Sequence, residues 1–449
     1  MLVSLDRLAR PFVVLSERYY PDPFVFAIVL SGATFALAVF ATPASPLEAV
    51  SIWGGGLTAF LGFAMQVCLV LVFAHALAHT RTFHRAIEIV ATFARTPAQA
   101  YALVAVVSGF ASFVAWGLGM VVGALAARAV AEAGRARRLA LHFPLLVASA
   151  YSGFVVWHMG YSGTALLAVA TPGHTLEAEM GLLPVTETML AGSNLAIAAV
   201  TLTVVALVCA AMAPAEGDSI LELGEDEQAA AEAPVAPIVA TPADRLDNSR
   251  VLSGGLGLLV LAFLVSWFVG RGLSLNLDIV NWTLLTAGLL LADSPRHYLA
   301  LVTSASRSLG PIVLQYPLYA GIVALMTQTD LVSLFADGFV AIANEETLGF
   351  WAFVSGGVLN FFIPSGGGQW AVQGPIFLTA ARELGVSSRI VVMGVAYGDQ
   401  WTNLVQPFWA LPLLAIAGLR ARDIMGYCFL AFLAAGICLG GGLLLLGEG

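Results

Sequence analysis

The sequence predicts an all-α membrane protein with many spans, built from two inverted copies of one helical unit. Three observations support this fold class. The chain is 59% hydrophobic and 10% charged, whereas soluble proteins are roughly 45–50% apolar. Several apolar stretches exceed the length of one span and are interrupted by glycine, proline and polar residues. The same order of landmarks also occurs in both halves of the chain.

Arginine supplies all the fixed positive charge, because the 449 residues include 19 arginines and no lysine. Arginine clusters therefore decide which loops are expected in the cytoplasm. The chain has no basic patch that would suit nucleic acid, and no cofactor motif. Four cysteines lie in apolar stretches without metal-ligand spacing and are expected to be buried: Cys68, Cys209, Cys428 and Cys438.

The first half, residues 1–213, is expected to start in the cytoplasm. Spans at 24–40 and 57–78 lead to an arginine cluster. The next stretch, 98–130, has arginines at both ends, which predicts a re-entrant hairpin with its tip at Trp116, Gly117 and Gly119. The elements that follow are a broken helix at about 141–170, interrupted near Ser162 and Gly163, and a span at 190–212.

Residues 214–250 form an acidic linker, which is expected to be flexible and cytoplasmic. The second half, 251–449, repeats the order of the first with opposite orientation and leaves the C-terminus outside. Arg296 and Arg307 place one of its connections in the cytoplasm. Its expected elements are spans at about 251–269, 278–292 and 309–326, a hairpin at 350–380, a broken helix at 390–418 and a span at 424–446.

The second hairpin is interrupted by Pro364, Ser365, Gly366, Gly367, Gly368 and Gln369. Proline and glycine oppose a continuous helix, so the helix is expected to stop there. Lipid cannot satisfy the freed backbone groups, so the break must be buried in protein or line a watery cavity. Its glycines are expected to need positive φ or a close backbone approach, which excludes β-branched side chains.

Three pairs of landmarks recur at offsets of 246–249 residues, which indicates an internal repeat. They are Gln66 and Gln315, Ser108-Gly109 and Ser355-Gly356, and Ala150-Tyr151 and Ala396-Tyr397. The arginine distribution makes the two copies run in opposite directions. Inverted repeats with broken helices are typical of secondary transporters, whose site lies near the bilayer midplane. Arg271, Arg382 and Arg389 do not fit this topology, because they would face outside.

The motifs resemble those of the bacterial short-chain fatty acid transporter family. They are NFFIPSGGGQWAVQGP (360–375), MQVCLVLVFAHALA (65–78), VWHMGYSG (156–163), ATPGH (170–174), LNLDIVNWTLLTAGLLL (275–291) and LQYPLYAGI (314–322). The resemblance implies membership of the ion transporter superfamily, whose members bind carboxylates between paired hairpins and work as dimers by an elevator movement. Sodium-coupled members often carry Ser-Asn-Thr at the hairpin tips. This chain has Trp-Gly-Leu-Gly and Pro-Ser-Gly-Gly-Gly at these tips, so the resemblance does not decide whether the coupling ion is H⁺ or Na⁺.

A short fatty acid is a carboxylate with a small apolar tail, and the interrupted spans contain no arginine or lysine to pair with it. Backbone N–H groups at the hairpin tips and helix breaks are therefore expected to bind it, with second arms beginning near Gly119 and Gln369. Nearby polar side chains are equally suited to helix capping. The candidates are Ser162, Ser365, Gln369, Thr402, Asn403 and His158, with Trp116, Trp157, Trp370 and Trp401 as walls for the tail.

Asp399 is the one carboxylate in an interrupted span, and such residues are functional candidates. Desolvation would favour its neutral form, so it could carry a proton; alternatively, it could bind Na⁺ with freed carbonyls, or cap a helix.

Two other functions of the protein remain as alternatives. A dicarboxylate transporter is one, and an intramembrane hydrolase using Ser365, His158 and Asp399 is a remote second, because no nucleophile elbow or metal motif is present.

Overall fold

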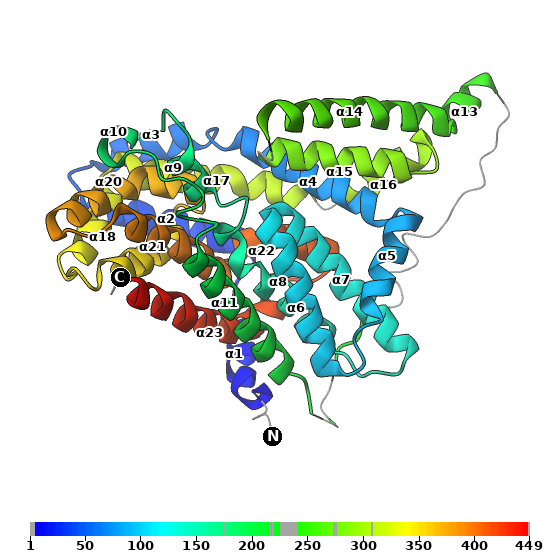
Figure 1. Cartoon of the computed structure of the whole chain (residues 1–449), viewed down its shortest axis with the longest axis horizontal. Coiled ribbons are helices and arrows are strands. Elements are labelled where there is room, and N and C mark those ends of the chain that lie inside the picture. The colour runs from blue at the N-terminus through cyan, green and yellow to red at the C-terminus, as the bar shows by residue number, and fades with distance from the viewer. Residues whose placement is uncertain are drawn as a thin grey trace.

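The computed structural model describes residues 5–174, 176–215, 217, 220–224, 241–272, 276–306 and 309–447. All regular elements in that part of the chain are helices (Figure 1). Eight of these helices are long and apolar enough to cross a membrane, or nine if one bent pair counts as a span. The prediction of an all-α polytopic membrane protein is therefore confirmed.

The first half forms eleven α-helices and one 3₁₀ helix within the described residues. They are α1 (Asp6–Tyr19), α2 (Pro23–Ala41), α3 (Pro46–Gly56), α4 (Leu61–Ala78), α5 (Arg81–Ala91), α6 (Pro97–Val114), α7 (Trp116–Ala136), α8 (Phe143–Gly153), η1 (Phe154–Met159), α9 (Thr164–Ala170), α10 (Glu177–Met180) and α11 (Gly192–Ala211).

The second half forms eleven α-helices within the described residues. They are α13 (Pro242–Asp247), α14 (Arg250–Arg271), α15 (Leu277–Leu291), α16 (Pro295–Ser306), α17 (Gly310–Gln328), α18 (Leu331–Val340), α19 (Leu348–Asn360), α20 (Gly366–Leu384), α21 (Ser388–Asn403), α22 (Pro407–Ala417) and α23 (Ala421–Gly447). The region after α17, expected as a plain loop, contains α18, which bends from α17 by 63°. Most of the linker at 214–250, and Arg307, lie outside the described residues.

One face, which we call the arginine face, holds three segments that contain arginine, residues 92–95, 135–143 and 420–423, together with residues 220–223 of the linker. Arg137 Nη1 donates to the carbonyls of Thr92 and Ala94, both at 3.1 Å, so the two ends of the first hairpin are adjacent. Phe143 N–H donates to Leu221 O at 2.8 Å. The Ser16 hydroxyl donates to Arg422 O at 3.1 Å. This is the arrangement that the arginine distribution predicts.

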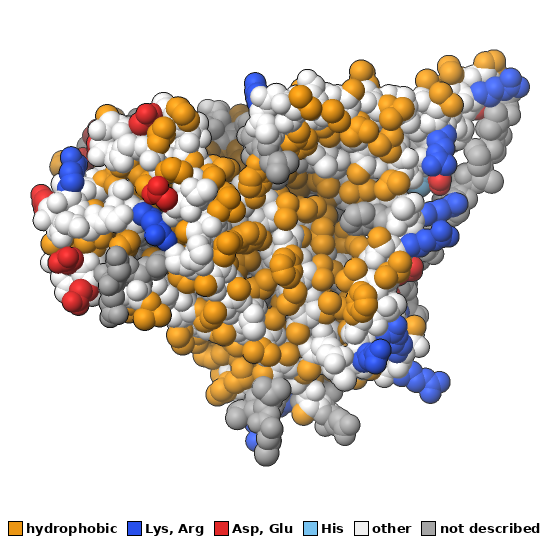
Figure 2. All heavy atoms as spheres, viewed as in Figure 1, with side chains coloured by type: hydrophobic (Ala, Val, Ile, Leu, Met, Phe, Trp, Pro, Cys, Tyr) orange, Lys and Arg blue, Asp and Glu red, His pale blue; other side chains and the backbone are white. Residues whose placement is uncertain are grey.

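The second hairpin opens toward the opposite face, where two of the three discordant arginines have partners. Arg382 Nη2 lies 3.8 Å from Glu179 Oε2, and Arg389 Nη2 donates to Ser193 Oγ at 2.6 Å. Arg271, at the end of α14, stacks over the Trp267 ring at 4.0 Å. Between the two faces, apolar side chains cover much of the visible surface, and most charged side chains lie toward its left and right margins (Figure 2).

The hairpins break at positions that differ slightly from the prediction. The first break is the single extended residue Ala115, and α7 starts at Trp116 rather than near Gly119. The second break spans residues 361–365, and its glycines form the first turn of α20, which starts at Gly366 rather than near Gln369. Neither Gly366 nor Gly367 has a positive φ. The first arm thus ends at Asn360, before Pro364 and earlier than expected, and the glycines serve as helix residues.

Each broken helix is held at its break by a tyrosine of the other half. The Tyr151 hydroxyl lies 2.5 Å from Asn403 O and 3.1 Å from Gln406 O, at the break between α21 and α22. The Tyr397 hydroxyl donates to Asn194 Oδ1 at 2.8 Å, and Asn194 Nδ2 donates to Met159 O at 2.9 Å, at the end of η1. The Ala-Tyr landmarks of the sequence therefore have equivalent roles in both copies.

Close backbone packing repeats in the same way. A Cβ on Gly153 of α8 would lie 2.1 Å from Ala105 O on α6. The equivalent Cβ on Gly398 of α21 would lie 2.2 Å from Phe353 O on α19. In each half the first hairpin arm thus lies directly on the first part of the broken helix, which brings both hairpin tips to the middle of the molecule.

Candidate transport site

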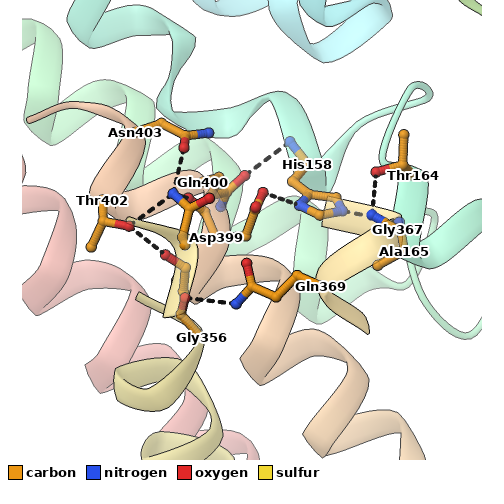
Figure 3. Close-up of polar contacts among 12 residues, drawn as sticks. His158, Thr164, Ala165, Gly356, Gly367, Gln369, Asp399, Gln400, Thr402 and Asn403 are labelled. Carbon is orange, nitrogen blue, oxygen red and sulfur yellow. Dashed lines mark hydrogen bonds and ion pairs between the residues drawn. The ribbon is translucent and has the colours of Figure 1, made fainter. Parts of the chain in front are cut away.

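His158 and Asp399 join the two halves at the centre of the protein. His158 Nδ1 lies 2.8 Å from Asp399 Oδ2, and both side chains are fully buried (Figure 3). His158 belongs to the break of the first broken helix, and Asp399 to α21 of the second. The His158 backbone N–H also donates to Gln400 Oε1 at 3.0 Å. Two residues that are 241 positions apart thus form one polar centre.

The contacts of His158 define its protonation state. The Ala165 backbone N–H, in the first turn of α9, donates to His158 Nε2 at 3.0 Å. Nε2 must therefore be unprotonated, and the ring proton is on Nδ1. This Nδ1–H donates to Asp399 Oδ2, so the geometry corresponds to a neutral imidazole that orients the carboxyl group of Asp399.

The loop of residues 160–164 contacts both hairpin tips. Trp116 N–H, at the start of α7, donates to Ser162 Oγ at 2.8 Å. Gly367 N–H, at the start of α20, donates to Thr164 Oγ1 at 2.9 Å (Figure 3). Gly366 lies against His158, because a Cβ added to it would be 2.1 Å from His158 Cε1. The second hairpin tip thus packs directly on the His158–Asp399 pair.

Buried amides extend this centre along α19, α20 and α21. Asn360 Nδ2 lies 2.8 Å from Asp399 O, 3.0 Å from Thr402 Oγ1 and 2.6 Å from Asn403 Oδ1. Gln369 Nε2 donates to Gly356 O at 2.7 Å and to Gln373 Oε1 at 3.1 Å. Asn360 therefore ties the first arm of the second hairpin to α21, and Gln369 ties the second arm to the first.

Several buried polar atoms of this centre have no hydrogen-bond partner among the described residues. Three are acceptors, namely Asp399 Oδ1, Asn360 Oδ1 and Gln369 Oε1. Others are donors: Gln400 Nε2, Asn403 Nδ2 and the indole N–H groups of Trp157, Trp370 and Trp409. An unpaired buried polar group is costly, so such groups are candidates for contacts with a bound ion or substrate.

Aromatic rings form the apolar surroundings of the centre. Trp157 stacks on His158 with ring centroids 4.3 Å apart, and Phe154 stacks on Trp157 at 5.8 Å. Trp409 lies 5.9 Å from Trp157 and 5.3 Å from Trp116. This cluster joins the first hairpin tip to both broken helices. Trp401 lies elsewhere, because its Nε1 donates to Phe432 O on α23.

The remaining sequence candidates are polar side chains, close-packed glycines and residues at the hairpin tips. Ser162 caps the first hairpin tip, and Thr402 and Asn403 belong to the amide network. Gly119 and Gly163 are close-packing positions, since an added Cβ would lie 1.8 Å from Ser112 Oγ and 2.3 Å from His158 O. Residues at the second tip are less enclosed than expected: Ser365 and Gly367 are half-buried and Gly368 is exposed, whereas Gly117 of the first tip is buried.

Sequence reasoning missed Asn360, Gln400 and Trp409, which contact the centre, and pointed to Thr164 only as the start of the second part of the first broken helix. A usable signal existed for two of them. Asn360 is an amide at the end of an apolar helix just before the glycine motif, and Gln400 adjoins Asp399. Polar side chains inside apolar spans are functional candidates in the same way as charged ones.

The comparison with known proteins defines the family. The profile described as short chain fatty acid transporter matches residues 4–446. The chain belongs to the short chain fatty acid transporter family. Relatives named for short-chain fatty acid transport occur in Escherichia coli K12, 38% identical over 96% of this chain and 98% of theirs, and in Haemophilus influenzae Rd, 35% identical over 96% and 97%.

Among solved structures, the crystal structure of the Alcanivorax borkumensis YdaH transporter, described as having an unusual topology, is 17% identical. It covers 95% of this chain and 98% of its own, with a TM-score of 0.44. Membership of the short chain fatty acid transporter family, together with the apolar helices, makes this chain a multi-pass membrane protein.

Proposed function

We propose that this protein is a secondary active transporter that moves small monocarboxylates, such as butyrate or acetoacetate, across the inner membrane. Transport is coupled to H⁺ or Na⁺ through Asp399. The observation that carries the proposal is the buried centre in which both hairpin tips and both broken helices meet around His158 and Asp399. Such a midplane site between inverted repeats suits alternating access.

The donors at this centre suit one carboxylate. Gln400 Nε2 and Asn403 Nδ2 are unpartnered within the described chain. The residues that hydrogen-bond to these two side chains, His158 and Asn360, are neither arginine nor lysine. A monocarboxylate needs few donors, whereas a dicarboxylate would require a second set or a fixed cation. The stacked rings of Trp157, Phe154 and Trp409 suit a short apolar tail.

A hydrolase built from Ser365, His158 and Asp399 is less well supported. In a hydrolytic triad the histidine nitrogen facing the serine must accept the hydroxyl proton. Here His158 Nε2 already accepts from the Ala165 backbone N–H. The family assignment also favours transport over catalysis.

We further propose an elevator movement in a homodimer, with the N-terminus in the cytoplasm and the C-terminus outside. The structural support is that the first hairpin opens to the arginine face, which the positive-inside rule places in the cytoplasm. The second hairpin opens to the opposite face, so each hairpin is available as a gate for one side.

Uptake of labelled butyrate, acetate and succinate into proteoliposomes tests the proposal under imposed H⁺ and Na⁺ gradients. We expect butyrate uptake that an inward gradient of one ion stimulates, with little succinate uptake. Preferential succinate uptake would replace the monocarboxylate proposal with the dicarboxylate alternative. Butyrate uptake that neither the H⁺ nor the Na⁺ gradient stimulates would contradict the proposed ion coupling.

A further inference from the structure

The three unpartnered acceptors of the centre belong to one small region. Asn360 Nδ2 donates to Asp399 O at 2.8 Å. Gln369 Nε2 donates to Gly356 O, one helical turn before Asn360, and a Cβ on Gly356 would lie 3.4 Å from Gly398 Cα. In Figure 3 the amide nitrogen of Gln369 faces Gly356 and its oxygen points the other way, in the direction of Asp399 in this view.

The orientation of both amides follows from their partners. Asn360 Nδ2 donates to the backbone carbonyl of Asp399, and Gln369 Nε2 donates to the backbone carbonyl of Gly356; a carbonyl can only accept. In each amide the nitrogen is therefore identified by its acceptors, and the oxygen is the free atom. Asp399 Oδ1 is a third free oxygen, because His158 occupies only Oδ2.

The charge of Asp399 also lacks a counterion in the described chain. His158 is neutral while its Nε2 accepts from Ala165 N–H, so it supplies a hydrogen bond and no net positive charge. A buried carboxylate needs a compensating charge. One proton on Oδ1 would neutralise it, but that O–H could donate to only one of the two amide oxygens. One monovalent cation could contact all three oxygens.

We propose that Asn360 Oδ1, Gln369 Oε1 and Asp399 Oδ1 bind one Na⁺ between the arms of the second hairpin and α21. Oxygen ligands with a single negative charge suit a hard monovalent cation. This inference rests on the proposed function and names its coupling ion. Because Asn360 ends one arm of the hairpin and Gln369 lies in the first turn of the other, Na⁺ would hold the arms together over His158.

Thermal unfolding of the purified full-length protein, without substrate, tests this site. NaCl is titrated at constant ionic strength against choline chloride, with KCl as a second comparison. We expect the Tm to rise with Na⁺ concentration and to stay level with K⁺ or choline, because a ligand that binds only the native state stabilises it. An equal response to all three salts would overturn the proposal.

Three variants locate the effect. Asp399→Asn removes the charge but leaves an oxygen that accepts from His158, and it should weaken Na⁺ binding at least tenfold. Gln369→Met removes one free oxygen and should also weaken binding. Gln315→Met is the matched control, because Gln315 Oε1 is also buried and without a partner in the described chain but lies on α17, outside the second hairpin and α21; it should keep the Na⁺ response.

Measuring Tm and butyrate uptake separately distinguishes failure of the Na⁺ site from failure of the proposed transport function. A Na⁺-dependent Tm without butyrate uptake would keep the ion site and reject the proposed function. A Tm that ignores Na⁺ but changes with pH in the parent, and not in Asp399→Asn, would show that a proton neutralises Asp399, and the Na⁺ site would be abandoned.

Discussion

Gly366 lies directly on the imidazole of His158, so that an added Cβ would be 2.1 Å from Cε1 and 2.7 Å from Nε2. The space that a side chain would need is thus occupied by the ring that orients Asp399. Its neighbour Gly367 differs, since a Cβ there would make only ordinary contact with Thr164, at 3.5 Å.

We expect Gly366→Ala to reduce uptake at least tenfold while the protein still reaches the membrane. The added methyl group must displace His158 and, with it, the hydrogen bond to Asp399. Gly367→Ala is the matched control and should keep most of the activity. Uptake in proteoliposomes, normalised to reconstituted protein, checks both variants. Equal uptake by the two would show that transport does not depend on the contact between Gly366 and His158.

The two hydrogen bonds of His158 can be removed separately. An asparagine amide can replace Nδ1–H, whereas a glutamine amide oxygen can replace Nε2. His158→Gln should leave Asp399 Oδ2 unpaired and lower the free energy of unfolding by more than about 3 kcal/mol, because an unsatisfied charged group costs more than a neutral one. His158→Asn should leave only the Ala165 N–H unpaired, at a cost of about 1–3 kcal/mol.

Thermal and denaturant unfolding in detergent measures this difference. The order of the two variants is the decisive result. If His158→Asn were the less stable variant, the Asp399 contact would matter less than the contact with the first turn of α9.

Tyr151→Phe should destabilise the protein by about 0.5–1.5 kcal/mol, because the carbonyls of Asn403 and Gln406 would each lose the hydrogen bond from this hydroxyl, while Asn403 O keeps the one from Gln406 N–H. Tyr319→Phe is the control, since the Tyr319 hydroxyl is buried and has no partner within the described chain. Its removal should leave the Tm level or raise it. Equal losses in the two variants would mean that the Tyr151 hydroxyl does not hold the break.

Cysteine labelling tests which face is cytoplasmic. In a background without the native cysteines, Phe93→Cys on the arginine face should resist an impermeant maleimide in intact cells. Leu182→Cys, on the loop near Glu179, should react. Both positions are exposed, at 68% and 43%, so accessibility within the protein does not limit the reaction. The opposite pattern would reverse the proposed orientation.

The fold was largely predictable because lipid restricts the backbone strongly. An apolar stretch too long for one span, with arginines at both ends, leaves few solutions besides a hairpin, and 98–130 indeed forms α6 and α7. The limits of each break were less predictable. Ala115 carries the whole first break, and an extended alanine in an apolar run has no sequence signal.

The centre was predictable only in part. His158 and Asp399 could be found singly, as the titratable residues of interrupted spans. Their contact could not, since it depends on how the two halves pack. For Gly366, positive φ or a close backbone approach was expected; the glycine is helical, and the group close to it is an imidazole from the other half.

Ser162 and Thr164 lie two residues apart and hold one hairpin tip each. Swinging either hairpin open breaks its bond to this loop, and displacement of the loop would then affect the tip that stays closed. A pathway open to both sides would require both bonds to break together. In the proposed ion-coupled mechanism, the loop shared by both tips would therefore hinder the leakage of ions through the protein.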